Sequence, residues 1–145
     1  MKKLIWQLVK RSSTMIGVDT KVLVRAYLED DKDQAKEAQE FLKNATKEKS
    51  LFISSYAILE FVWVLKVKGY DRKEIYKAVL SLTDSYGIII SQQDIVLETI
   101  TKYLNGKADF GDYMIVVDGE RNKTHKLKTF DMVLQRELKD NQNVL

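Results

Sequence analysis

Four acidic residues of this chain adjoin or interrupt apolar segments, where an unpaired charge is least favourable. They are Asp19, Glu60, Asp112 and Asp131. Burying a carboxylate costs roughly several kcal/mol unless it is paired or binds a metal. Because one small domain would have to meet that cost four times, we expect these side chains to converge on divalent cations. A site of that kind favours metal-assisted hydrolysis of phosphodiesters.

Composition narrows the ligands that such a site can use. The chain has 145 residues and 45% hydrophobic content, which suits a single domain, placed at residues 15–145. There is no cysteine and only one histidine, His125. Disulfides, zinc–thiolate sites and multi-histidine sites are therefore excluded, and carboxylates remain as the dense ligand set. Oxygen ligands suit hard cations, above all Mg²⁺ or Mn²⁺.

Residues 1–14 form a basic N-terminal extension, for which terminal fraying is the ordinary expectation. The formal charge of the chain is +3, and this segment contributes Lys2, Lys3, Lys10 and Arg11. The body of the protein is therefore close to neutral, so attraction to nucleic acid must come from local patches. No apolar stretch is long enough to span a membrane or to act as a secretory signal. We expect a cytoplasmic protein that makes no membrane contact.

Short apolar runs alternate with segments of helical periodicity. The expected strands are Met15–Asp19, Leu51–Ile53, Gly87–Ile90 and Leu127–Phe130, with a further edge strand at Asn143–Leu145. This alternation predicts an α/β fold of three layers, in which helices cover both faces of a central, mostly parallel sheet of four to five strands. Ligands collect at the C-terminal strand ends of such sheets, where Asp19 and Asp131 are expected to meet.

The helix expected to run from Ser54 or Ser55 to Lys68 has almost no polar face. A helix that is apolar all round is normally buried, so Trp63 is assigned to the core and Glu60 becomes the most anomalous acid of the chain. Thr20 is expected to cap the helix at Val22–Leu28. The other helices are expected at Asp33–Thr46, after Asp71, at Gln92–Leu104, at Asp109–Val117 and from Asp131 through Leu138.

Four segments together resemble the PIN-domain ribonucleases, specifically the VapC-type toxins of bacterial toxin–antitoxin pairs. They occur in the family's order and span about residues 15–135. The segments are Ile16-Gly-Val-Asp-Thr-Lys-Val-Leu-Val-Arg25, Phe52-Ile-Ser-Ser-Tyr-Ala-Ile-Leu-Glu-Phe-Val-Trp-Val-Leu65, Ala108-Asp-Phe-Gly-Asp-Tyr-Met-Ile115 and Lys128-Thr-Phe-Asp131.

The resemblance implies roles for particular residues. Asp19, Glu60 and Asp112 match the family's three principal metal-binding acids, and Asp131 matches a fourth. Asp109 matches an additional acid that is frequent at the start of the same helix. Small hydroxyl residues next to the site, suited to orienting carboxylates or water, are matched by Thr20 and Thr129.

The resemblance also implies an activity and partners. It implies a Mg²⁺- or Mn²⁺-dependent endoribonuclease that acts on structured RNA such as tRNA or rRNA. Family members are commonly homodimers, and a VapB-like antitoxin inhibits them by wrapping around the toxin. The apolar surface of the helices at Val22–Leu28 and Asp33–Thr46 suits either a dimer seam or an antitoxin groove, and plain core packing explains it equally well.

Several basic residues have more than one interpretation. Lys21 stands where the family often has asparagine, and we expect its side chain to point away from the acids. Arg121, Lys123 and Lys126 lie between the third and fourth acids, where phosphate contact and simple solvation are equally compatible with the pattern. His125 lies in the same basic loop, and an incidental role fits it better than general-base catalysis.

Two other classes of protein with strand-end acids, one enzymatic and one a receiver domain, fit less well. An aspartyl-phosphate hydrolase needs a second acid two residues after the strand-end aspartate, and Lys21 occupies that position. A receiver domain would not need Glu60 within an apolar helix. The alternative from another class is a PIN-like module that binds RNA or protein without catalysis, although all four matched acids are present.

Overall fold

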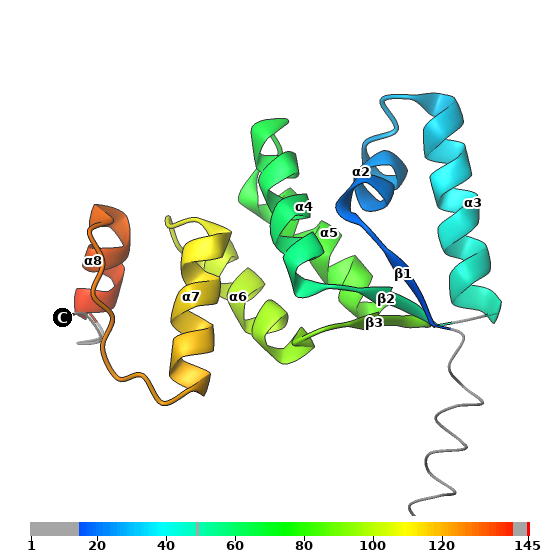
Figure 1. Ribbon diagram of the computed structural model, residues 1–145. Helices are drawn as coiled ribbons and strands as arrows, with labels where there is room; N and C mark the ends of the chain where they lie inside the picture. Colours follow the sequence, from blue (N-terminus) through cyan, green and yellow to red (C-terminus); the bar gives the residue numbers. More distant parts are fainter. Residues whose placement is uncertain (1–14, 49, 141–144) are drawn as a thin grey trace, which may run out of the picture.

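The computed structural model describes residues 15–48, 50–140 and 145. It is an α/β structure with a parallel sheet flanked by helices (Figure 1). Three strands form the sheet within the described residues: β1 (Ile16–Val18), β2 (Leu51–Ile53) and β3 (Ile88–Ile90). The predicted α/β class is confirmed, whereas the predicted count of four to five strands is wrong for this part of the chain.

All strand pairs are parallel and in order β1-β2-β3. Val18 pairs with Ile53, and Ile53 pairs with Ile90, so the C-terminal ends of the strands are level. The residues that follow these ends therefore lie along one edge of the sheet. They are Asp19, Ser54 and Ser91.

Helices form the other regular elements of the described residues, and Figure 1 shows how they are arranged around and beyond the sheet. The bounds of these helices are α2 (Thr20–Leu28), α3 (Lys32–Glu48), α4 (Ser55–Val67), α5 (Arg72–Asp84), α6 (Gln93–Asn105), α7 (Phe110–Arg121) and α8 (Met132–Asp140). Of these, α8 stands farthest from the strands.

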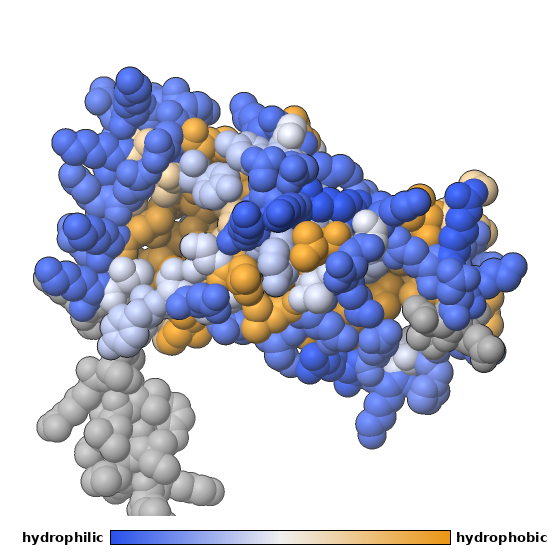
Figure 2. Space-filling view, turned by 180° about the vertical axis from the view of Figure 1, so that it is seen from behind, coloured by the Kyte–Doolittle hydropathy of each residue, from blue (hydrophilic) through white to orange (hydrophobic). Residues whose placement is uncertain are grey.

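The sheet is buried more deeply on one face than on the other. Leu51 and Ile53 on the central strand are fully buried, together with Ile90 at 4% exposure. The side chains of the intervening row, Phe52 and Ile89, point to the opposite face, and Ile89 is 44% exposed. Apolar surface is visible at the sheet end of the molecule in Figure 2. Helices flank the sheet, as the sequence pattern predicts, and they cover the row of Phe52 and Ile89 less completely than the row of Leu51 and Ile53.

The apolar helix α4 is buried along only one side. Ile58, Phe61, Val62 and Leu65 are at most 2% exposed and form much of the core. Tyr56, Trp63 and Val67 occupy the opposite side, and Trp63 is 64% exposed. The prediction that Trp63 belongs to the core is wrong, because composition alone does not show how many neighbours cover a helix.

The predicted fourth strand at Leu127–Phe130 does not form. Arg121 at the end of α7 binds Asp94 and Glu98 of α6, and the following segment turns toward α8. There the Thr129 carbonyl accepts a hydrogen bond from Gln135 at 2.6 Å. The segment is therefore held by α8 and has no ladder to β1 within the described part of the chain.

The remaining predictions about the chain ends are only partly covered. The Leu145 amide donates to the Leu127 carbonyl at 3.0 Å, but residues 143–144 of the proposed edge strand lie outside the described residues. The extension at residues 1–14 also lies outside them. None of the helices in the described ranges has the length and apolar character needed to cross a membrane.

Glycine is needed at position 87, immediately before β3, for two reasons: its backbone conformation and the close approach of α3. Its φ is +79°, and a Cβ atom there would lie 2.6 Å from the Thr46 carbonyl oxygen of α3. Gly69 has a similar φ of +94° but open space around it. We predict that Gly87→Ala lowers the free energy of unfolding by roughly 3 kcal/mol, against about 1 kcal/mol for Gly69→Ala. Urea denaturation of both variants measures the difference, and equal losses would contradict the close approach of α3 to β3.

Candidate metal and catalytic site

Asp19 is the first acid that the fold places at the C-terminal edge of the sheet. It follows β1 and is the N-cap of α2, where its Oδ1 accepts a hydrogen bond from the Val22 amide at 3.3 Å. The capping role predicted for Thr20 therefore belongs to Asp19. Thr20 is instead the first residue of α2, and its hydroxyl is free to contact another element.

Glu60 is joined to this edge through that hydroxyl. Thr20 Oγ1 donates to Glu60 Oε2 at 2.8 Å, which links the start of α2 to the middle of α4. The predicted use of Thr20 in orienting a carboxylate is compatible with this contact. Glu60 is nevertheless exposed, as are Asp19 and Asp131, and Asp112 is only half-buried. The expectation of buried carboxylates is thus wrong, because the acids border the core without entering it.

The start of α7 supplies the second group of acids. The backbone amide of Asp109, the N-cap of α7, donates to Asp112 Oδ2 at 3.4 Å. Between them, Gly111 lies so close to α4 that a Cβ atom there would be 3.4 Å from Leu59 Cδ1. Because Leu59 precedes Glu60, the first turn of α7 packs against the turn of α4 that carries the glutamate.

The pKa of the Asp112 carboxyl is raised above its ordinary value. Partial burial is the main cause, and the negative charges of Asp131 and Asp109 raise it further. The hydrogen bond from the Asp109 amide and the positive charge of Lys66 act in the opposite direction. The Asp112 carboxylate is therefore repelled by Asp109 in its own helix start and by Asp131 before α8, and a cation would relieve that repulsion.

The positive charge of Lys66 offsets part of the repulsion at Asp112. Its ammonium forms a short hydrogen-bonded ion pair with Asp109, and the pair raises the pKa of Lys66. Both side chains are more than half exposed, so the pair contributes little to stability. Its consequence for the site is that Asp109 is already engaged by a cation of the protein.

Asp131 precedes α8 and caps it. Its Oδ1 accepts from the Leu134 amide at 2.8 Å, while its own amide donates to Thr129 Oγ1 at 3.1 Å. Thr129 thus orients the backbone at Asp131, which is a different role from contacting the carboxylate. Asp131 remains near enough to influence Asp112 electrostatically.

The acids form two groups, with Asp19 and Glu60 in one and Asp109, Asp112 and Asp131 in the other. Asp19 and Lys21 line one depression, whereas Asp109 and Asp112 line a different one. Among residues 15–48, 50–140 and 145, no three acidic or histidine side chains are grouped so that they could enclose a metal ion. The donors fit a hard divalent cation in chemistry, and the two groups would have to approach for all of them to share it.

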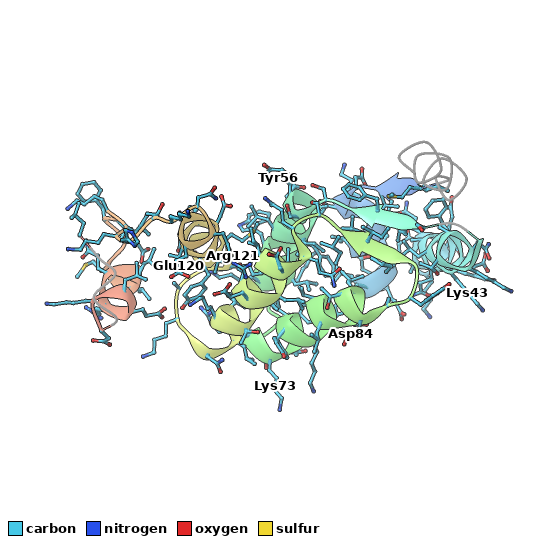
Figure 3. All side chains as sticks on the ribbon, turned by 90° about the horizontal axis from the view of Figure 1, so that it is seen from below. Lys43, Tyr56, Lys73, Asp84, Glu120 and Arg121 are labelled. Carbon is cyan, nitrogen blue, oxygen red and sulfur yellow. The ribbon has the colours of Figure 1, made fainter. Side chains whose placement is uncertain are left out.

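The depression beside Asp109 and Asp112 is an open groove of about 840 Å³ between α4 and α7. Its walls are largely apolar, and the side chains of Tyr56 and Trp63 are 74% and 64% exposed. In Figure 3, Tyr56 points away from the ribbon on the side opposite to Lys73 and Asp84 of α5. The groove therefore offers exposed aromatic surface next to two of the acids.

The basic residues proposed for RNA contact differ in whether acids of the protein already bind their charged groups. Arg121 is engaged by Asp94 at 2.7 Å and Glu98 at 2.8 Å, so its guanidinium serves the α6–α7 packing (Figure 3). Lys123 and Lys126 are exposed in the loop that follows α7, with His125 between them. Lys21 is also exposed, next to Asp19.

The model of the PIN domain family matches residues 16–137. The chain is a PIN-domain protein. That match contains all five acids of the two groups, and PIN domains are commonly metal-dependent nucleases. No curated protein and no solved structure matches the chain. The family and its nuclease-type fold are therefore shown, whereas the roles assigned to single residues of this PIN domain stay predictions.

Two residues that bear on the acids are not predicted from the sequence. Lys66 is the single basic residue within the sequence of α4, and this feature of the sequence could have pointed to its contact with an acid. Arg72 begins α5 and contacts the loop before Asp109, and no local pattern indicates such a long-range contact. The contacts of these two residues can be identified only once the fold places α4, α5 and α7 together.

The raised pKa of Asp112 yields a prediction about stability. A raised pKa means that the folded chain favours the protonated carboxyl, so the ionised form destabilises the fold at neutral pH, and this effect disappears below the ordinary carboxyl range. We predict that Asp112→Asn raises the melting temperature at pH 7 in EDTA, and that the gain shrinks as pH falls toward 4. Thermal melts against pH measure it.

Glu120→Gln, an exposed position on the same helix, is the matched control and should show no such gain. A lower melting temperature for Asp112→Asn at pH 7 would contradict the repulsion among Asp109, Asp112 and Asp131.

Proposed function

We propose that this PIN-domain protein is a Mg²⁺- or Mn²⁺-dependent endoribonuclease. The observation that supports this most directly is the Asp112 carboxyl, whose pKa is raised by partial burial and by the charges of Asp131 and Asp109. The Asp109 amide and Lys66 lower the pKa of Asp112, but burial and the two neighbouring acids outweigh them. Such an arrangement is typical of positions that hold metal ions or catalyse reactions.

Asp19, Glu60, Asp112 and Asp131 would hold the cation, with Asp109 as a further donor. A divalent cation bound there would supply charge neutralisation at the phosphate and activation of a water molecule. Thr20 would keep Glu60 in place through the hydrogen bond at 2.8 Å. The α2 cap would fix the orientation of Asp19, since its Oδ1 is already engaged by the Val22 amide.

RNA is the proposed substrate, in the tRNA or rRNA class. The groove between α4 and α7 supports it, because Tyr56 and Trp63 offer faces on which bases can stack beside the acids. Of the three basic residues considered for RNA contact, Lys123 and Lys126 are the two that we assign to phosphates. The engagement of Arg121 by two acids argues against an RNA-binding role for that residue.

The biological role that we propose is that of a cytoplasmic toxin neutralised by a VapB-like antitoxin, and acting as a homodimer. This role is proposed from the resemblance to VapC-type toxins. It is supported by exposed apolar side chains that a partner can cover, among them Tyr27 of α2 and Phe41 of α3, at 39% and 41% exposure. A reading frame for a small DNA-binding protein next to this gene would support the pairing.

A second candidate is a PIN-like module that binds RNA or protein without catalysis. Two observations favour it: the acids are not assembled around one point among the described residues, and Lys66 already neutralises Asp109. The two candidates differ in what the acids do, so substitution of the acids separates them.

We predict that Asp19→Asn and Glu60→Gln each lower RNA cleavage by about 100-fold or more, because each would remove a ligand whose cation supplies several kcal/mol of transition-state stabilisation. Cleavage of labelled RNA in Mn²⁺ measures the loss, and growth on induction provides a second readout. Excess EDTA should abolish cleavage by the unaltered protein.

Asp84→Asn is the matched control and should cleave normally, because Asp84 is an exposed carboxylate on α5 that belongs to neither group of acids; Figure 3 shows it on the side of the ribbon opposite to Tyr56. Unchanged cleavage by Asp19→Asn and Glu60→Gln, or full activity in EDTA, would favour the non-catalytic module and contradict the proposed nuclease.

A further inference from the structure

Arg72 connects the start of α5 to the loop that leads into α7. Its Nη1 donates to the Tyr103 carbonyl at 2.7 Å, and its Nη2 donates to the carbonyls of Lys107 at 2.7 Å and Ala108 at 2.9 Å. The guanidinium carbon also lies 4.2 Å from the centre of the Tyr103 ring. One side chain thus satisfies three backbone acceptors and stacks on an aromatic ring.

These acceptors lie where the chain leaves α6 and approaches the acids. Tyr103 belongs to the last turn of α6, whose carbonyls have no helical partners of their own. Lys107 and Ala108 directly precede Asp109, the N-cap of α7. Arg72 therefore ties the last turn of α6 to the end of the short loop at residues 106–108, directly before the point from which α7 begins.

The same loop is held from its other side by α7 and α8. The Lys107 amide donates to Glu137 Oε1 at 2.7 Å, and the Ala108 amide donates to the Tyr113 hydroxyl at 3.1 Å. That hydroxyl donates to Glu137 in turn. Gly106 is confined by the same group, because a Cβ atom there would lie 1.8 Å from the Tyr113 oxygen.

The loop before Asp109 is thus clamped on both sides by side chains that are not themselves proposed ligands. Burial of Ala108, at 3% exposure, places the clamp against the core. Because Asp112 is one helical turn after Asp109, any movement of this loop would also displace both carboxylates. The contacts made by Arg72 are the ones that anchor the loop to the helices nearest the sheet.

We propose that Arg72 is a positioning residue for the metal site, holding the start of α7 so that Asp109 and Asp112 present their carboxylates to a shared cation. This inference rests on the proposed function. Arginine is required because its planar fork reaches three carbonyls while its face stacks on Tyr103. Lysine would keep the charge but could not reproduce this set of contacts.

Three variants and one control test the proposal by Mn²⁺ affinity, measured calorimetrically on the full chain well below its melting temperature. Arg72→Lys and Arg72→Met should weaken Mn²⁺ binding by about tenfold or more, the usual effect of losing a residue that supports metal ligands. Lys73→Met removes the neighbouring exposed cation of α5 and should bind as the unaltered protein does. Asp112→Asn should lose most Mn²⁺ binding.

A purely structural role would lower the melting temperature and leave Mn²⁺ affinity intact. Normal affinity in folded Arg72→Lys, with binding lost in Asp112→Asn, would overturn the role of Arg72 alone. Normal affinity in Asp112→Asn would overturn the proposed metal site itself. Failure of Arg72→Lys to fold would also overturn the inference, since it would show that Arg72 supports the whole domain.

Discussion

The parallel pairing of three short strands is the constraint on which the described structure depends. Each strand has only three residues, yet their level register places every C-terminal strand end on one edge. At that edge Asp19 is the N-cap of α2 and Ser54 is the N-cap of α4, the helix that contains Glu60. The Thr20–Glu60 hydrogen bond then joins α2 to α4 through two residues that are 40 positions apart in the sequence. The first group of acids is therefore a direct product of strand pairing.

The second group depends on helix packing instead. The start of α7 is set by its contact with Leu59 of α4 and by the clamp on the loop before Asp109. Asp131 reaches the electrostatic environment of Asp112 from the cap of α8, the helix most distant from the sheet. The domain thus offers carboxylates from two separately positioned groups, and the charges of Asp109 and Asp131 next to Asp112 favour a cation in the second of them.

The fold class and the positions of most elements could be predicted from the sequence because they follow from local periodicity. Burial could not, because an apolar run does not show which side of its helix packs on the core, and Trp63 and Glu60 both lie on the exposed side of α4. The strand expected at Leu127–Phe130 was wrong because the Gln135–Thr129 contact holds that segment against α8. The ion pair of Lys66 and the clamp of Arg72 depend on distant partners, which periodicity does not reveal.

We propose that carboxylates from both groups of acids bind one cation. Anomalous diffraction from crystals grown with MnCl₂ tests it directly, because the scattering of manganese locates the ion without reference to activity. We expect a single peak coordinated by Asp112 together with at least one of Asp19 and Glu60. Manganese bound at Asp112 with Asp19 and Glu60 remote from it, or absent from all of these carboxylates, would contradict the claim.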